Sequence, residues 1–263
     1  MLPNVNLLPL ALLLTLASAT TTSTNTTCPP HDYTTHILSL SPLVVYIPNF
    51  LTRSETTHLQ LLSAGKFSPS QIADTSGQQH LANTRTSQSA SLSSDNEVVR
   101  CIEQRALDFQ GFDVQRERLE PLQLVQYSAS HEFHSHTDWF TSPAQTTRQH
   151  GGNRVSSFFV YVHASDDLVG GGTRFPLLDA PASERWCGWL DCDAETEDGV
   201  VFRPVEGNAV FWRNDARGGS KGPFVGDGRV VHAGLPVQRG RKVGMNVWTR
   251  EGALDESVRG GGV

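Results

Sequence analysis

The sequence has no cluster of basic residues. Its 21 Lys and Arg are outnumbered by 27 Asp and Glu, which gives a formal net charge of −6. Nucleic acids and anionic membranes need a basic surface, so we expect neither as a partner. The chain also lacks any Cys-x-x-Cys pair and any visible internal repeat. Zinc sites built from such cysteine pairs are therefore not expected.

A long apolar run is lacking as well. The run at residues 7–16 is too short to span a bilayer comfortably. It is followed by Ala17-Ser18-Ala19, which predicts a signal peptide over residues 1–19, although no Lys or Arg precedes the run. We therefore expect a secretory-pathway protein, retained in the endoplasmic reticulum lumen or secreted. A type II membrane anchor is the less favoured alternative. The sequon at Asn25 then predicts a glycoprotein, and no KDEL-type signal ends the chain.

Cysteine is scarce but even in number. The four cysteines are Cys28, Cys101, Cys187 and Cys192. In an oxidising compartment an even count favours two disulfides, for which three connectivities are open, and four free thiols remain the alternative. We favour Cys187–Cys192 as a local link, which leaves Cys28–Cys101 to tie the amino-terminal tail to a helix.

Two capping-box patterns predict helices in the first half of the chain. Thr52-x-x-Glu55 is expected to open a helix that runs through Ala64. Ser94-x-x-Glu97 is expected to open a second helix, whose apolar side chains recur at helical spacing: Val98, Ile102, Ala106 and Phe109. Between them, residues 68–93 are polar and predict a loop with at most one edge strand. Both helices are expected to pack on a sheet as scaffold.

Short strand patterns dominate the rest of the sequence. They occupy residues 43–47, 122–127, 132–139, 155–162, 200–203, 208–212, 229–235 and 241–249, with one more after the glycine turn at 170–172. Such a series, preceded by helices, predicts an α+β, mainly β fold with a double-stranded β-helix (jelly-roll) core. We place this single domain at residues 40–252, between flexible tails at 20–39 and 253–263.

One strand carries metal-ligand residues. Residues two apart on a strand point to the same face, so His136 and Asp138 should project together. One imidazole and one carboxylate make up two-thirds of a 2-His-1-carboxylate facial triad, which holds Fe(II) and leaves three positions open. A solvated polar strand would also produce this pair. A zinc site that uses His134 and His136 is a further alternative and is less favoured.

A second histidine and a lysine follow near the end of the chain. His232 lies in the strand pattern 229–235, and Lys242 lies in the next one. If these strands pair as a hairpin, both side chains can face one interior, with the ammonium behind the metal. Such a cation suits the far carboxylate of a 2-oxo acid that chelates iron. The ordinary interpretation is that His232 is a buried core residue and Lys242 a solvated surface residue. That interpretation does not explain why His136-x-Asp138, His232 and Lys242 occur in this order on predicted strands.

Several segments together resemble the catalytic domain of the prolyl 4-hydroxylase α-subunit type, within the Fe(II)/2-oxoglutarate dioxygenases, and above all its small fungal secretory members. The resemblance covers about residues 40–250 and is carried by residues 122–127, His136-x-Asp138, Asn153-Arg154, Tyr161, 171–176, 207–212, 232–236, Lys242 and Trp248. It implies that His136, Asp138 and His232 bind Fe(II) and that Lys242 pairs with 2-oxoglutarate. It also implies O₂ and ascorbate as further co-reactants.

The resemblance gives roles to four more residues. Tyr127 matches a residue that lines the co-substrate pocket, and Tyr161 and Ser157 match its wall, where Ser157 replaces a commoner Thr. Trp248 matches an aromatic residue beside the iron. Three features depart from the family: the amino-terminal peptide-binding domain of the animal collagen enzymes is not expected, Val243 stands where Trp is common, and His134 is unusual.

The expected activity is hydroxylation of prolyl residues in an extended, proline-rich secreted polypeptide, since polyproline II segments expose their side chains. Residues 68–93 and 214–228 are candidate lids. An oxygenase acting on lysyl residues or on a small metabolite is the nearest alternative. A non-catalytic metal-binding or peptide-binding module is the alternative from another class.

Overall fold

The computed structural model describes residues 28–259, apart from 75, 112–113, 196–197 and 219–221. The predicted signal peptide and the sequon at Asn25 lie outside the described residues. Within this described part, no helix is long and apolar enough to cross a membrane.

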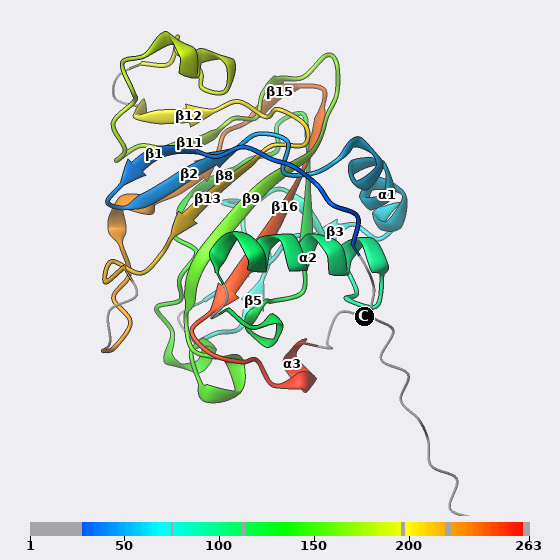
Figure 1. Ribbon diagram of the computed structural model, residues 1–263, viewed down its shortest axis with the longest axis vertical. Coiled ribbons are helices and arrows are strands. Elements are labelled where there is room, and N and C mark those ends of the chain that lie inside the picture. The colour runs from blue at the N-terminus through cyan, green and yellow to red at the C-terminus, as the bar shows by residue number, and fades with distance from the viewer. Residues whose placement is uncertain (1–27, 75, 112–113, 196–197, 219–221, 260–263) are drawn as a thin grey trace, which may run out of the picture.

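Two antiparallel sheets form the framework (Figure 1). The larger one has the order β1 (His36–Leu40), β2 (Leu43–Ile47), β13 (Ala209–Arg213), β9 (Arg154–Ala164), β16 (Arg241–Arg250), β7 (Gln123–Ser128), β6 (Gln88–Ser91), β3 (Ser68–Pro69). The smaller one has the order β12 (Val200–Phe202), β11 (Thr173–Phe175), β14 (His232–Gly234), β8 (Phe133–His136). Two short pairs complete the set: β10 (Val169–Gly170) with β15 (Val237–Arg239), and β4 (Ile72–Ala73) with β5 (Gln79–His80). The predicted mainly β, jelly-roll class is confirmed.

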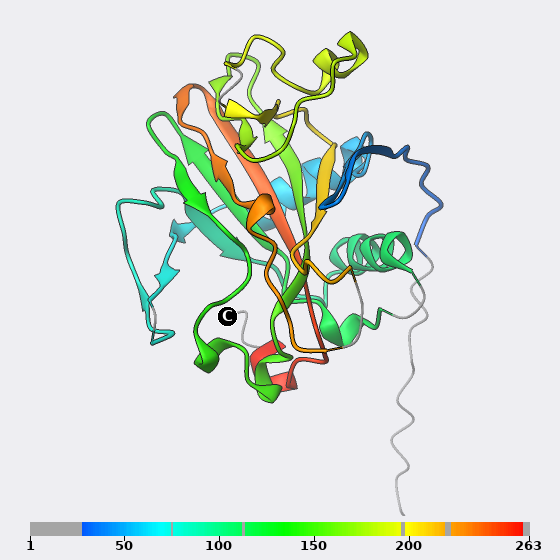
Figure 2. The ribbon, with the colours of Figure 1, turned by 90° about the vertical axis from the view of Figure 1, so that its left-hand side faces the viewer.

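The larger sheet separates two hydrophobic clusters. α1 (Arg53–Ser63) and α2 (Glu97–Gln110) cover one face, opposite the β4–β5 pair (Figure 2). Along β16 the side chains alternate, so that Val243, Met245 and Val247 join the cluster under the helices. Trp248 points to the other face, toward the smaller sheet. The functional residues therefore lie between the two sheets, and the helices only support them.

One helix start follows its predicted cap and the other does not. At α1 the Thr52 hydroxyl accepts from the Glu55 amide and the Glu55 carboxylate accepts from the Thr52 amide, which confirms the capping box. At α2 the cap is Asn96, whose side chain accepts from the amides of Val98 and Val99. The Ser94 prediction is wrong, because Asn is an equally good cap and stands directly before Glu97.

Both predicted disulfides are present, Cys28–Cys101 and Cys187–Cys192. The first ties the chain before β1 to α2. The flexible tail predicted for 20–39 is therefore wrong from residue 28 onward, because this disulfide and the pairing of β1 with β2 hold that segment on the fold.

Two further segments are more ordered than predicted. Leu254 is buried and α3 (Glu256–Arg259) follows it, inside the segment predicted as a carboxy-terminal tail. The polar segment 68–93 was predicted as a loop with at most one edge strand. It contains β3, β4, β5 and β6, because β6 finds backbone partners along β7 and β3 pairs with β6 in turn.

Candidate metal centre

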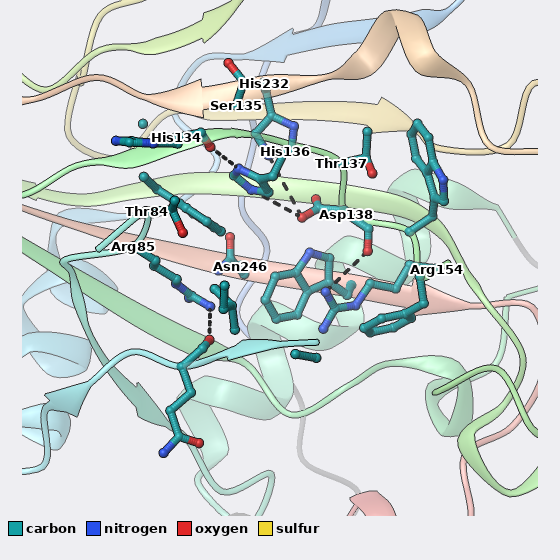
Figure 3. Close-up of a pocket in the computed structure, with 18 of the residues that line it drawn as sticks. Thr84, Arg85, His134, Ser135, His136, Thr137, Asp138, Arg154, His232 and Asn246 are labelled. Atoms are coloured by element: carbon teal, nitrogen blue, oxygen red, sulfur yellow. Dashed lines mark hydrogen bonds and ion pairs between the residues drawn. The ribbon is translucent and has the colours of Figure 1, made fainter. Parts of the chain in front are cut away.

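The pairing of β8 with β14 brings two histidines together. His136 lies directly opposite His232 in this antiparallel pair. Asp138 follows two residues after β8, which ends at His136 rather than at the predicted Trp139. Ligand atoms of the three side chains all lie within 4.8 Å of one another (Figure 3). Asp138 Oδ1 is 4.0 Å from His136 Nε2 and 3.9 Å from His232 Nε2.

Backbone carbonyls orient both imidazoles. His136 Nδ1 lies 2.8 Å from the His134 carbonyl oxygen, and His232 Nδ1 lies 3.1 Å from that of Val230. Each Nδ1–H can donate to its carbonyl, which leaves the Nε2 lone pair facing Asp138. Burial and the neighbouring His232 lower the pKa of His136. His136 is therefore neutral at physiological pH, and neutral imidazole is the form that binds a metal ion.

The Asp138 carboxylate is buried and ionised. Burial alone would raise its pKa, but the nearby His232 and His136 lower it overall. One oxygen, Oδ2, accepts a 2.5 Å hydrogen bond from the Ser157 hydroxyl on β9. The donor set of two imidazoles and one carboxylate fits Fe(II) and leaves room for further ligands.

The three residues line an open pocket of about 500 Å³. Its walls are rich in aromatic side chains: Phe133, Trp139, Phe140, Phe159 and Trp248. Phe133 stacks on the His136 ring at 3.6 Å between ring centres. Two cations, Arg85 and Arg154, also line the pocket (Figure 3). The site therefore combines an apolar surface with hydrogen-bond donors.

Lys242 lies behind one wall of this pocket. Its side chain is fully buried on β16, and its ammonium lies 4.6 Å from the centre of the Tyr127 ring. The ammonium donates to the carbonyl oxygen of Gly171, and no described salt bridge supplies it with a carboxylate. Burial lowers the pKa of Lys242 to about 7. A buried ammonium with one protein acceptor fits an incoming acid group.

The predicted hairpin between the strands of His232 and Lys242 is wrong. β14 pairs with β8 and β11 in the smaller sheet, whereas β16 pairs with β7 and β9 in the larger one. Because the sheets face each other, His232 and Lys242 still point to the same interior. His232 also begins its strand instead of lying at its centre, because residues 228–230 form a 3₁₀ turn.

The other predicted site residues lie at different depths. Tyr127 and Trp248 line the pocket. Tyr161 is one layer further in, where its hydroxyl donates to Thr173 at 2.9 Å. Ser157 contacts Asp138 rather than the pocket surface. The roles of these four residues in binding the co-substrate stay predictions.

Sequence reasoning gave no role to Arg85 or Arg154. The guanidinium carbon of Arg154 lies 3.5 Å from the centre of the Trp248 ring. Arg154 belongs to the Asn153-Arg154 segment of the resemblance, which was the one sequence signal for a place near the site. Arg85 stands in a polar segment without a distinguishing pattern. His134 does not join the cluster: its side chain is 53% exposed and faces Glu132. This placement disfavours the zinc alternative built on His134.

The metal centre predicts which histidine substitutions abolish metal binding. Replacing His136 or His232 with Ala removes one of three ligands, and we expect Fe(II) or Co(II) affinity to fall by more than about 100-fold. His134→Ala should leave the affinity unchanged, because His134 faces away from the cluster. Isothermal titration of the metal-free protein measures this. Equal losses for His134→Ala and His136→Ala would contradict the assignment.

Comparisons with known proteins agree with this geometry. Residues 122–250 match the family model of the 2OG-Fe(II) oxygenase superfamily. Prolyl 4-hydroxylase 5 of Arabidopsis thaliana is 29% identical over 215 residues, which cover 81% of this chain and 69% of the plant protein. Prolyl 4-hydroxylase subunit alpha-2 of Gallus gallus is 29% identical over 213 residues, covering 80% of this chain. The chain spans only 34% of that subunit.

A solved structure shares the fold. The viral collagen prolyl hydroxylase of Paramecium bursaria Chlorella virus-1, in its 2OG complex, superposes with a TM-score of 0.55 at 19% identity, over 78% of this chain and 94% of that one. The matched family segment contains the three clustered residues and Lys242. With the ligand geometry, the matched segment and the relatives in agreement, residues 122–250 belong to the 2OG-Fe(II) oxygenase superfamily.

Proposed function

We propose that the protein hydroxylates prolyl residues of an extended polypeptide, with Fe(II), 2-oxoglutarate and O₂, and with ascorbate as the reductant that maintains the iron. The observation that carries the proposal is the cluster of His136, Asp138 and His232 in the lining of an open pocket with aromatic walls. The prolyl 4-hydroxylase relatives support the substrate class.

The protein's own residues would bind and orient the reactants. His136, Asp138 and His232 would hold Fe(II), which when bound supplies the redox chemistry that activates O₂. Lys242 would neutralise the far carboxylate of 2-oxoglutarate, and burial between the sheets keeps water from competing for that contact. The chain would thus hold the reactants around one point that faces the pocket.

The pocket walls suit a proline-rich segment. Proline rings pack on flat aromatic surfaces, and Phe133, Trp139, Phe140 and Trp248 offer such surfaces around the metal centre. A polyproline II backbone has carbonyl groups without internal partners. Arg85 lines the pocket and donates to the Gln71 carbonyl and the Gln123 side chain, which leaves further N–H groups of its guanidinium to donate to such a carbonyl.

The two candidate lids meet the pocket differently. Segment 71–79 contributes lining residues directly. The described residues of segment 214–228 contribute none, but Gly226 lies against Trp139, where an added Cβ would come within 2.3 Å of the indole. We infer that residues 71–79 shape the pocket and that Gly226 supports the Trp139 side chain in the pocket wall. The two disulfides favour an oxidising compartment, and we infer that the protein works in the secretory pathway.

Oxygen transfer to proline is the direct test of the activity. The full chain with Fe(II), 2-oxoglutarate and ascorbate should add one oxygen to proline-rich peptides, located on proline by tandem mass spectrometry, with release of succinate. His136→Ala should give neither product, because the metal centre is incomplete. Oxygen found on lysine, or succinate release that peptide never stimulates, would contradict prolyl hydroxylation while leaving the oxygenase class in place.

The buried lysine predicts a pH dependence for co-substrate binding. Below its pKa of about 7, Lys242 is already protonated and can pair with the carboxylate. Above that pH, binding must take up a proton, because the bound anion favours the charged amine. The affinity for 2-oxoglutarate should therefore fall by up to about tenfold per pH unit as the pH rises from 7.

Calorimetry of the Mn(II)-loaded protein from pH 6.5 to 9, in two buffers of different ionisation enthalpy, measures both the affinity and the proton uptake. Lys242→Met should lose most of the affinity and all of its pH dependence. Lys66→Met, which alters an exposed lysine, is the matched control. A wild-type affinity that is constant across this range would show that Lys242 does not titrate on binding.

A further inference from the structure

A chain of buried hydrogen bonds leads from the end of β13 to the metal-site carboxylate. Asn214 Nδ2 donates to Ser157 Oγ at 3.0 Å, and Ser157 Oγ donates to Asp138 Oδ2 at 2.5 Å. Asn214 and Ser157 are fully buried and Asp138 is 6% exposed. Neither Ser157 nor Asn214 lines the pocket, and their hydrogen bonds lead to the metal centre through Asp138.

The direction of this chain follows from proton counting. The Ser157 hydroxyl has one proton and lies between the Asn214 amide and the ionised Asp138. If the amide oxygen faced Ser157, two acceptors would compete for that single proton. With the amide nitrogen facing it, Ser157 accepts from Asn214 and gives its proton to Asp138. Asn214 therefore fixes the direction in which the hydroxyl points.

The backbone holds Asn214 firmly in this position. The backbone N–H of Asn214 donates to the backbone carbonyl of Val155 at 2.9 Å. The backbone carbonyl of Asn214 accepts from the backbone N–H of Asp227 at 2.8 Å. Val155 lies on β9, the strand that carries Ser157. The side-chain amide is thus placed before any metal ion arrives, as a supporting group must be if it is to orient a ligand.

We propose that Ser157 and Asn214 are positioning residues that hold Asp138 as a one-oxygen metal ligand. The hydrogen bond from Ser157 occupies Oδ2, while Oδ1 is the oxygen that faces His136 and His232. A carboxylate released from Ser157 can rotate and offer both oxygens, which would fill a coordination position that the co-substrates need. The inference rests on the proposed role of Asp138 as a ligand.

Co(II) binding without 2-oxoglutarate tests the proposal apart from turnover. Ser157→Ala should weaken Co(II) affinity by about 10- to 100-fold and change the visible absorption bands, because the coordination number changes. Ser157→Thr keeps the hydroxyl and should retain the wild-type Co(II) affinity and the wild-type absorption bands. Ser156→Ala is the matched control, because that neighbouring hydroxyl bonds to Gln110 on the helix side of β9. Thermal unfolding of the metal-free proteins establishes that each variant folds.

Asn214→Ala should weaken Co(II) binding less than Ser157→Ala, because the serine proton can still reach Asp138. The double variant should bind no more weakly than Ser157→Ala alone if the two residues act as one unit. If Ser157→Ala does not fold, Ser157→Cys keeps the volume with a weak donor and should show the same spectral change.

Wild-type affinity and spectrum in folded Ser157→Ala or Ser157→Cys would overturn the positioning role alone. Failure of the wild-type protein to bind Co(II) would overturn the metal centre itself, so the two failures are distinguishable.

Discussion

The site depends on one strand pair. Because β8 and β14 align with His136 opposite His232, two imidazoles from distant parts of the chain meet at the edge of the smaller sheet. The turn after β8 then brings Asp138 to the same point. A slip of one residue in this register would move one histidine to the opposite face of the sheet and leave the carboxylate without its partners.

The larger sheet supplies what surrounds this cluster. β9 contributes Ser157 against the carboxylate, and β16 contributes Trp248 at the pocket and Lys242 behind it. Glu120, shortly before β7, forms ion pairs with Arg154 and Arg250 at 2.7 and 2.6 Å. Paired in this way, the Arg154 guanidinium is held over the Trp248 ring beside the pocket. Within the part of the chain that the structure describes, Lys242 has no such pairing, which suits it to an acid brought by a co-substrate.

Sequence patterns with short-range causes were the easiest to interpret. The series of short strands preceded by helices predicted the fold class. The His-x-Asp spacing predicted that His136 and Asp138 lie together, although Asp138 lies after the end of β8 and not on the strand. Contacts between the two sheets could not be predicted from the sequence. Nothing local indicates that the Ser157 hydroxyl meets Asp138, because that contact depends on how β9 packs under the turn after β8. The hairpin assumed for His232 and Lys242 failed for the same reason: β14 joined the smaller sheet and β16 joined the larger one.

The most direct test of this account is anomalous diffraction at the iron absorption edge, from crystals grown without oxygen in the presence of Fe(II) and 2-oxoglutarate. We predict one iron peak bounded by Nε2 of His136, Nε2 of His232 and Oδ1 of Asp138, with the far carboxylate of 2-oxoglutarate at the Lys242 ammonium. An iron peak away from these three atoms, or a co-substrate anchored elsewhere, would contradict the account.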